Sequence, residues 1–228
     1  MEISVVIPCL NEEQNIKKCI DKCLASFELL GIDAEVIVVD NNSTDKTAEI
    51  AASSGAKVVE CKDVGYGYAL RKGFSVCRGK YIMMGDGDDS YDFNELPRFY
   101  NTIISSDCKM VTGTRLKGDI KKGAMPFLHR YIGTPFLTFI LNLFYKAGIS
   151  DVNCGMRMFE SEVLKDLNFR TGGMEFASEL FTTFAKKKLK IIEIPISLYP
   201  AAKGRESKLN TFRDGFRHLF YLISALWE

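Results

Sequence analysis

The chain has 228 residues, of which 46% are hydrophobic, and a formal net charge of +1. This length suits one sizeable domain or two small ones, and the nearly balanced charge does not favour nucleic acid as a partner. The seven cysteines are odd in number and include no Cys-x-x-Cys pair, and only two histidines accompany them. We therefore expect no zinc site, and we expect reduced thiols in a cytoplasmic protein.

Neither a signal peptide nor a membrane-spanning helix is expected. The first residues, MEISVVIP, lead directly into a strand pattern. The most apolar runs are Phe136–Tyr145 and Leu219–Trp227. Both are shorter than the roughly 20 residues that cross a bilayer, although each could lie on a membrane surface.

Apolar strands and helices alternate through the first half of the chain. Short apolar runs predict strands at Ile3–Ile7, Glu35–Val39, Lys57–Glu60 and Tyr81–Met84. Helical spacing predicts one helix that begins at Asn11, one that ends near Ala52 and one over Tyr68–Cys77. The second half is less regular, with further elements expected at Lys109–Thr112 and Ile191–Leu198 (strands) and at Arg130–Lys146 and Thr211–Trp227 (helices).

This alternation predicts an α/β fold, a mostly parallel sheet flanked by helices in a single domain of residues 1–228. The strands are nearly continuous in apolar character, as expected when both faces of a sheet are covered. Ligands of such sheets bind at the carboxyl ends of the strands. Four polar segments follow the first four strands and should meet in one crevice: Pro8–Glu12, Asp40–Asp45, Gly65–Gly67 and Asp86–Asp89.

Asp86 and Asp88 carry the sharpest chemical signal. Alternate aspartates after a strand can face one ligand, and their hard oxygens suit Mg²⁺ or Mn²⁺ shared with substrate phosphates. An isolated Asp-x-Asp is more often a solvated turn, but three other polar strand ends nearby favour a metal site. Asp40 could accept hydrogen bonds from a ribose or a base, or it could cap a turn. Gly65–Leu70 contains only part of a dinucleotide fingerprint, so we expect a glycine turn that brings a helix start close to the ligand.

Three motifs occur in order along the chain: IPCLNE from Ile7, VVDNNSTD from Val38 and GDGD from Gly85. Together they resemble family 2 glycosyltransferases of the GT-A fold. The later segments Thr112–Arg115, Ser150–Arg157 and Gly204–Leu209 resemble polyprenyl-phosphate glycosyltransferases of the dolichol-phosphate mannose synthase type. The resemblance covers nearly the whole chain. It implies a nucleotide-sugar-binding half over about 1–112 and an acceptor half over about 113–228 that ends in an amphipathic helix.

The resemblance also implies roles for individual residues. The nucleotide sugar would be bound by Pro8, Asn11, Glu12, Asp40, Asp86, Gly87 and Arg205. A Mg²⁺ or Mn²⁺ would be held by Asp86 and Asp88. The catalytic group would comprise Asp88, Arg115, Arg130, Arg157, Glu175 and Lys208, with the three arginines facing an acceptor phosphate and Lys208 closing over the diphosphate. Ser90 departs from the pattern, because such relatives tend to carry glutamine there.

These features predict a metal-dependent, inverting transfer of a hexose from a UDP- or GDP-sugar to a polyprenyl phosphate at the inner face of the membrane. A dication and basic side chains would stabilise the charge on the departing diphosphate. A phosphate acceptor is already an anion, whereas a hydroxyl acceptor needs a base. The candidate bases are Asp151, Glu175 and Glu179.

Three alternatives stay open. One is a glycosyltransferase with a hydroxyl acceptor, and another is a binding module that holds a nucleotide sugar without turnover. A nucleotidyltransferase is disfavoured, because Pro8–Glu12 is neither glycine-rich nor basic. The base, the sugar, the acceptor lipid and the oligomeric state are not determined by the sequence.

Overall fold

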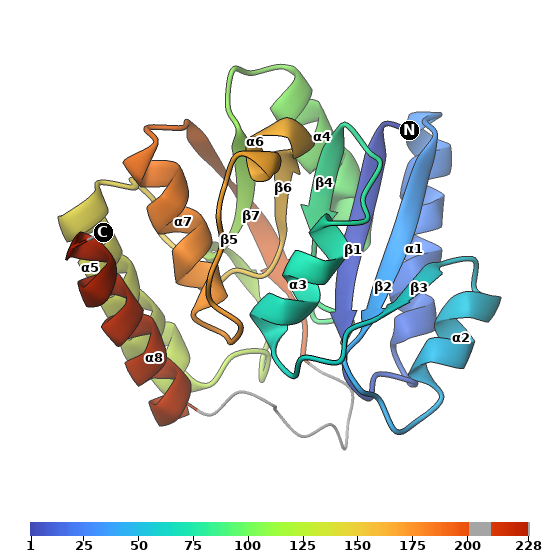
Figure 1. The fold of residues 1–228 in the computed structure, drawn as a ribbon, viewed down its shortest axis with the longest axis horizontal. Coiled ribbons are helices and arrows are strands. Elements are labelled where there is room, and N and C mark those ends of the chain that lie inside the picture. Colours follow the sequence, from blue (N-terminus) through green and yellow to red (C-terminus); the bar gives the residue numbers. More distant parts are fainter. Residues whose placement is uncertain (201–210, 228) are drawn as a thin grey trace.

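Seven strands form one sheet in a computed structural model that describes residues 1–200 and 211–227. The strand order is β3-β2-β1-β4-β6-β5-β7 (Figure 1). The strands are β1 (Ile3–Cys9), β2 (Ala34–Asp40), β3 (Lys57–Glu60), β4 (Tyr81–Met84), β5 (Met110–Ile120), β6 (Arg157–Glu160) and β7 (Ile191–Leu198). All neighbours pair in parallel except β6, which is antiparallel to both β4 and β5. The predicted α/β fold with a mostly parallel sheet is confirmed.

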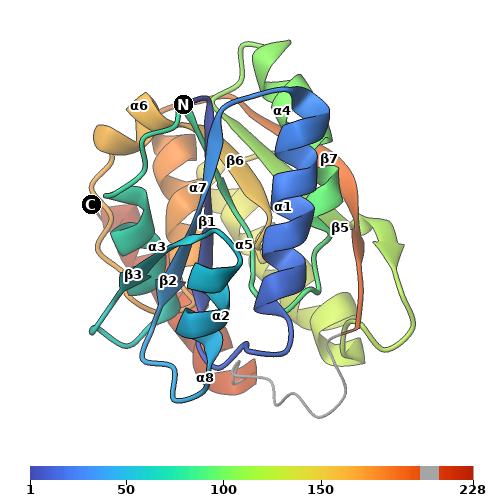
Figure 2. The same ribbon diagram turned by 90° about the vertical axis from the view of Figure 1, so that its right-hand side faces the viewer.

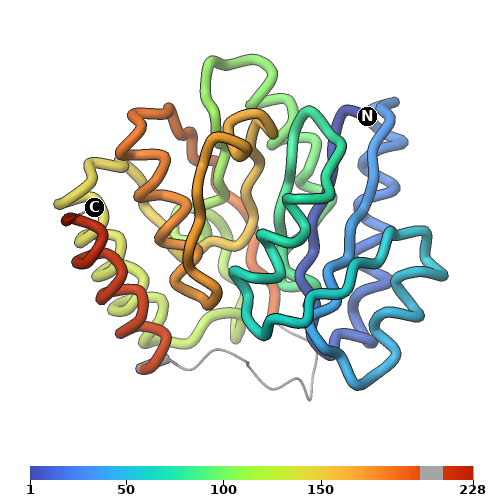
Figure 3. The backbone as a smooth tube through the Cα atoms, in the orientation of Figure 1, coloured from blue at the N-terminus to red at the C-terminus, as the bar shows by residue number. Residues whose placement is uncertain are grey.

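Helices cover both faces of this sheet, as Figure 2 shows from its edge. One face carries α1 (Ile16–Leu30), α2 (Thr47–Ser53), the turn η1 (Phe93–Glu95) and α4 (Leu96–Ile104). The other face carries α3 (Tyr66–Phe74), α6 (Ser161–Lys165) and α7 (Phe176–Lys186). Outside α7 lie the π-helical turn η2 (His129–Gly133), α5 (Thr134–Tyr145), α8 (Thr211–Ser224) and η3 (Ala225–Trp227). The tube in Figure 3 shows α5 and α8 side by side at that edge.

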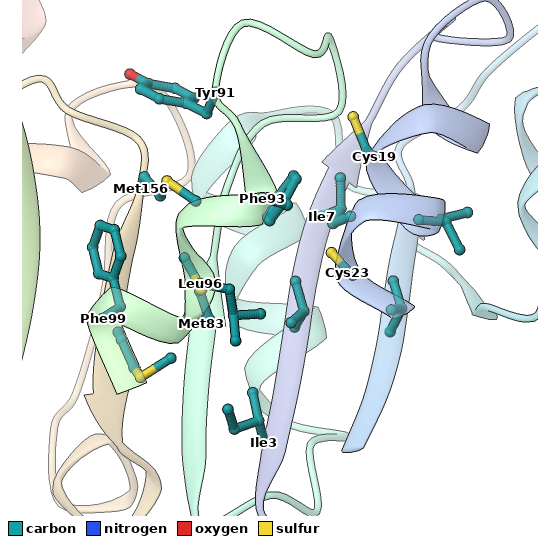
Figure 4. Packing of buried hydrophobic residues seen from close by; sticks show 14 of the residues in the cluster. Ile3, Ile7, Cys19, Cys23, Met83, Tyr91, Phe93, Leu96, Phe99 and Met156 are labelled. Carbon is teal, nitrogen blue, oxygen red and sulfur yellow. The ribbon is translucent and has the colours of Figure 1, made fainter. Parts of the chain in front are cut away.

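The alternation of side chains along β1 divides the core in two. Successive strand residues point to opposite faces, so Ile3, Val5 and Ile7 pack under α1 and α4, whereas Val6 packs under α3 and α7. In Figure 4, Cys19 and Cys23 of α1 and Phe93, Leu96 and Phe99 lie in the first cluster. The seven cysteines all lie within the described residues; they are free thiols, and six of them are buried.

The sequence predicted the bounds of several strands closely, but it predicted less well the elements that depend on partners distant in the chain. The bounds of β3, β4 and β7 are those expected. The expected helix from Asn11 begins at Ile16 instead, because residues 12–15 form turns that lead into it. The expected helix 130–146 is divided between η2 and α5. β6 was not predicted; it is four residues long, begins with Arg157, and its strand character depends on pairing with β4 and β5.

β1 is the third strand of the sheet, with β2 on one side and β4 on the other. The order of the strands reverses here, and an open sheet leaves a crevice at such a point. Cys9 pairs with Asp40 at the carboxyl ends of β1 and β2, and β4 ends at Met84, which pairs with Val6 of β1. The polar segments that follow these strands therefore share one edge of the sheet.

Gly87 permits the loop after β4 to lie against β1. A Cβ atom at this position would lie 2.6 Å from Cys9 Sγ and 3.2 Å from Ile7 Cγ2. Overpacking of this kind costs about 1–3 kcal/mol. We predict that Gly87→Ala lowers the free energy of unfolding by that amount, as measured by urea titration.

Gly215→Ala in α8 is the matched control for this substitution. A Cβ atom there meets nothing within 4 Å, and alanine is the better helix former. This variant should be as stable as the parent or more stable. If Gly87→Ala matched the parent as well, the loop would not depend on its close approach to β1.

Candidate active site

A cleft of about 350 Å³ opens at the carboxyl edge of the sheet. Its polar lining comes from the loop after β4, from β5, from the start of α5 and from α8. The ionisable and polar side chains in that lining include Tyr66, Asp86, Asp88, Ser90, Tyr91, Arg115, His129, Thr134, Asn153, Asp214 and His218. Apolar side chains, among them Met125, Pro126, Leu137 and Met174, cover the remaining wall. The cleft therefore combines acidic groups, a cation and an apolar side.

Asp86 and Asp88 lie in this cleft with defined partners. Tyr66 donates its hydroxyl to Asp86 Oδ1 over 3.1 Å. Asp88 is 9% exposed, and its Oδ1 accepts hydrogen bonds from the main-chain N (3.0 Å) and the hydroxyl (2.6 Å) of Ser90. Ser90 thus orients the Asp88 carboxylate.

These two aspartates fit an ion that arrives with a phosphate ligand. Within residues 1–200 and 211–227, no group of three or more His, Cys, Asp or Glu side chains is placed to hold a metal ion. Mg²⁺ is commonly bound by one or two carboxylates that share it with substrate phosphates. The hard oxygens of Asp86 and Asp88 match that arrangement and do not match a site built from protein ligands alone.

The loops after β1 and β2 are joined by hydrogen bonds. Asn11, with a left-handed φ of 53°, accepts a bond from Thr44 N (2.7 Å) at its Oδ1. Glu12 N donates to Thr47 Oγ1 (2.8 Å), and Asp40 Oδ1 accepts from Ser43 N (3.2 Å). The structure therefore brings the expected nucleoside-binding residues to one place, the carboxyl ends of two paired strands. They are Pro8, Asn11, Glu12 and Asp40.

Arg115 reaches the cleft from β5 and is held by Asp151. Its Nε and NH2 donate to the two carboxylate oxygens of Asp151 over 2.7 and 2.8 Å, and its main-chain N donates as well (3.0 Å). Asp151 is fully buried. Because this carboxylate is engaged on both oxygens, it positions a guanidinium and is poorly placed to accept a proton from a substrate.

The other two arginines differ from Arg115. Arg130 lies in η2 beside the cleft, with its guanidinium 5.4 Å from the centre of the Tyr131 ring. Arg157 is fully buried, and it donates to the main-chain oxygens of Val152, Cys154 and Ala177 over 2.9–3.0 Å. The structure does not bring Arg157 into the cleft lining; its donors join β6 to α7 and to the preceding loop.

Glu175 and Glu179 are both occupied near the start of α7. Glu179 accepts hydrogen bonds from the main-chain N of Arg170 (2.8 Å) and of Thr171 (2.9 Å). Glu175 forms an ion pair with Arg217 of α8 (3.0 Å) and accepts from Gly173 N (3.2 Å). The cleft is lined beside them by Met174 and Ala177. Arg205 and Lys208 lie outside the described residues.

Several cleft residues were missed from the sequence. Tyr66 and Tyr91 belong to segments that were noted only for glycines or aspartates. His218 lies on the inner side of α8, with its Nδ1 2.7 Å from Ser178 Oγ. Asp214, one helical turn earlier, also lines the cleft. The spacing of Asp214 and His218 was available in the sequence, but which side of α8 faces inward depends on tertiary packing.

Burial of His218 makes stability depend on pH. The ring is 4% exposed, and burial lowers the pKa of His218 from 6.5 to about 4, against the opposing charges of Glu175 and Asp214. Between these pH values the unfolded chain binds a proton that the folded chain does not, so stability falls as the pH falls. We predict that this group costs the fold up to about 3 kcal/mol between pH 7 and pH 4.

Chemical denaturation of the parent and of His218→Gln over this pH range tests the prediction. The variant loses the contact with Ser178, so it should be less stable at pH 7, but its stability should decline less steeply with falling pH. Identical pH slopes for the two proteins would contradict a neutral, buried imidazole.

Comparison with known proteins identifies relatives. Residues 4–167 match the model of Glycosyl transferase family 2. The chain is 46% identical over 224 residues to the low-salt glycan biosynthesis hexosyltransferase Agl6 of Haloferax volcanii. The aligned region covers 98% of this chain and 54% of that protein. It therefore spans about half the length of this relative. It is also 33% identical over 217 residues to a dolichyl-phosphate hexose transferase of the same organism, covering 94% and 89% of the two chains.

A solved structure shares the fold. Glucosyl-3-phosphoglycerate synthase from Mycobacterium tuberculosis, crystallised with Mn²⁺, UDP and glucosyl-3-phosphoglycerate, superposes with a TM-score of 0.76 at 22% identity. The match covers 99% of this chain and 79% of that one. The predicted GT-A fold is thereby confirmed. Because the family model spans well over half of the chain, the protein belongs to glycosyl transferase family 2 and is a glycosyltransferase.

Proposed function

We propose that the protein is a metal-dependent, inverting glycosyltransferase that transfers a hexose from a UDP- or GDP-sugar to a polyprenyl phosphate. The observation that carries this proposal is the placement of Asp86, Asp88 and Arg115 in one cleft with an apolar wall. In this proposal residues of about 1–112 bind the donor and those of about 113–228 bind the acceptor. The chain 1–228 acts as one domain.

On the donor side, Pro8, Asn11, Glu12 and Asp40 would line the nucleoside. Asp86 and Asp88 would hold a Mg²⁺ or Mn²⁺, which supplies charge stabilisation to the departing diphosphate. Tyr66 donates a hydrogen bond to Asp86, and Ser90 donates one to Asp88. Gly87 lets their loop lie against β1, and Arg205 and Lys208 would complete the diphosphate site.

On the acceptor side, Arg115 offers a guanidinium that is fixed by Asp151. Guanidinium groups bind phosphate in bidentate fashion, and Arg130 beside the cleft adds a second cation. The three carboxylates expected as bases are engaged: Asp151 with Arg115, Glu175 with Arg217, and Glu179 with the 170–171 main chain. An acceptor that is already an anion needs no base. The relative named as a dolichyl-phosphate hexose transferase supports the same choice.

A hydroxyl acceptor is the second candidate. It is favoured by Asp214, a carboxylate that lines the cleft. The synthase that shares the fold has also been crystallised with phosphoglyceric acid. Either acceptor would attack the anomeric carbon of the donor hexose within the same cleft and displace the nucleoside diphosphate, so the product distinguishes them.

We further propose that this chain associates with the inner face of the membrane. No helix within the described residues is long and apolar enough to span a bilayer. The edge formed by η2, α5 and α8 exposes large apolar side chains, here called the apolar edge: Phe127, Leu128, Tyr131, Ile132, Phe136, Phe139, Leu143, Phe144, Phe216, Phe220, Ile223, Leu226 and Trp227. Exposed patches of this kind commonly mark protein or membrane contacts. α5 and α8 also supply walls of the cleft, so a lipid acceptor could enter from this side.

Product formation tests the reaction. The parent should convert a polyprenyl phosphate and one of a panel of UDP- and GDP-sugars to a lipid-linked hexose in the presence of Mn²⁺ or Mg²⁺. Asp88→Asn should reduce turnover by about 100-fold or more, since it weakens stabilisation of the leaving group.

Asp89→Asn is the matched control, because Asp89 turns to Lys22 (2.7 Å) and its φ of 60° is one that asparagine tolerates. It should keep most of the activity. A hexose attached to a hydroxyl compound would favour the second candidate. Nucleotide binding without any transfer would reject both.

Vesicle sedimentation tests the membrane proposal. Phe216 and Phe220 lie on the apolar edge and are exposed. Removing both, in Phe216→Ser/Phe220→Ser, should weaken binding to vesicles that contain phosphatidylglycerol by about 10-fold or more, because each buried phenyl group contributes about 1.5–3 kcal/mol.

Leu29→Ser/Val64→Ser is the control, since both residues are exposed elsewhere on the surface. This double variant should bind vesicles as the parent does. A parent that stays in the supernatant with every vesicle composition would refute membrane association by this edge.

A further inference from the structure

The Asp86 carboxylate lies between a tyrosine and a glycine. Its Oδ1 accepts the Tyr66 hydroxyl over 3.1 Å. On the other side, a Cβ atom built on Gly155 would lie 2.7 Å from Asp86 Oδ2 and 3.0 Å from Tyr91 Cε2. The carboxylate therefore rests against the main chain at Gly155, and Tyr66 supplies a directional contact to its other oxygen.

Tyr66 is itself fixed by a close approach of main chains. It opens α3 between Gly65, whose φ is 152°, and Gly67. A Cβ atom on Gly65 would lie 2.2 Å from Gly172 O, and one on Gly67 would lie 2.6 Å from Thr171 O. Only glycines permit this contact, which places the first turn of α3 directly on residues 171–172.

Residues 170–172 are anchored in turn by α7. Glu179 accepts the main-chain N–H groups of Arg170 and Thr171, and Tyr68 N donates to Gly172 O over 3.2 Å. A continuous set of contacts thus runs from α7, through this segment and the first turn of α3, to Asp86. Glu179 therefore has a structural role. Gly65 and Gly67 are explained by this close packing, without a dinucleotide fingerprint.

We propose that Tyr66 is a positioning residue for Asp86, whose hydroxyl orients the carboxylate toward the metal ion and diphosphate of the donor. This inference rests on the proposed function. Hydrogen bonds to a ligating carboxylate fix its direction, and losing such a partner typically costs about 10- to 100-fold in metal affinity.

The test is Mn²⁺ affinity in the presence of saturating UDP or GDP, measured from the electron paramagnetic resonance signal of free Mn²⁺. Tyr66→Phe keeps the ring and removes the hydroxyl, and it should weaken Mn²⁺ binding about 10-fold or more. Its melting temperature should stay near that of the parent, and so should its affinity for the nucleotide without metal.

Tyr68→Phe is the matched control, because Tyr68 lies two residues away in the same turn and is exposed. It should bind Mn²⁺ as the parent does. In an Asp86→Asn background, Tyr66→Phe should have no further effect on Mn²⁺ affinity, as expected when one residue acts through the other.

Unchanged Mn²⁺ affinity in Tyr66→Phe would overturn the inference and leave the proposed function standing. An equal loss in Tyr68→Phe, or an additive loss in the Asp86→Asn background, would also overturn it. A parent that binds no Mn²⁺ with either nucleotide would instead refute the metal step of the proposed function, and the inference would fall with it.

Discussion

The buried ion pair between Arg115 and Asp151 is the interaction on which the second half of the site depends. A charge in a protein interior is tolerated when it is paired and its hydrogen bonds are satisfied, and removing one partner is strongly destabilising. Asp151 meets three N–H groups of Arg115, so strand β5 and the loop before β6 hold each other in place. A guanidinium fixed in this way can receive a phosphate with little loss of side-chain freedom.

The same rule explains the other buried charges. Arg157 donates to main-chain oxygens, and Glu179 accepts from main-chain N–H groups. Glu175 pairs with Arg217, but its buried Oε2 accepts no hydrogen bond. None of these three groups lines the cleft, whereas Asp86, Asp88 and Arg115 do. Arg157, Glu175 and Glu179 therefore hold the surrounding structure together, whereas the charged groups in the cleft are available to a ligand. Residue type alone does not distinguish the two groups.

Sequence reasoning recovered what is local and missed what depends on distant partners. The polar segment after β4 lines the cleft, as the general rule for parallel sheets led us to expect. The polar segments after β1 and β2, residues 8–12 and 40–45, lie at the same edge of the sheet but do not line this cleft. The position of Arg157 could not be predicted, because its partners are main-chain oxygens of residues brought near by folding. β6 was missed because a strand of four residues is defined mainly by its pairing with distant strands. The inward side of α8 was missed because Asp214 and His218 are polar, yet tertiary packing buries them.

The place of β6 in the sheet has a consequence for how the protein folds. β6 lies between β4 and β5, yet it follows both in the chain. While the protein is being made, β4 therefore has an open edge, and β5 has no neighbour on the β6 side, until residue 160 has been added. Pairings over such separations are slow to form, and an open strand edge can recruit other chains. The two halves of the sequence are thus steps of one folding reaction, and the cleft is completed only after the second half has been synthesised.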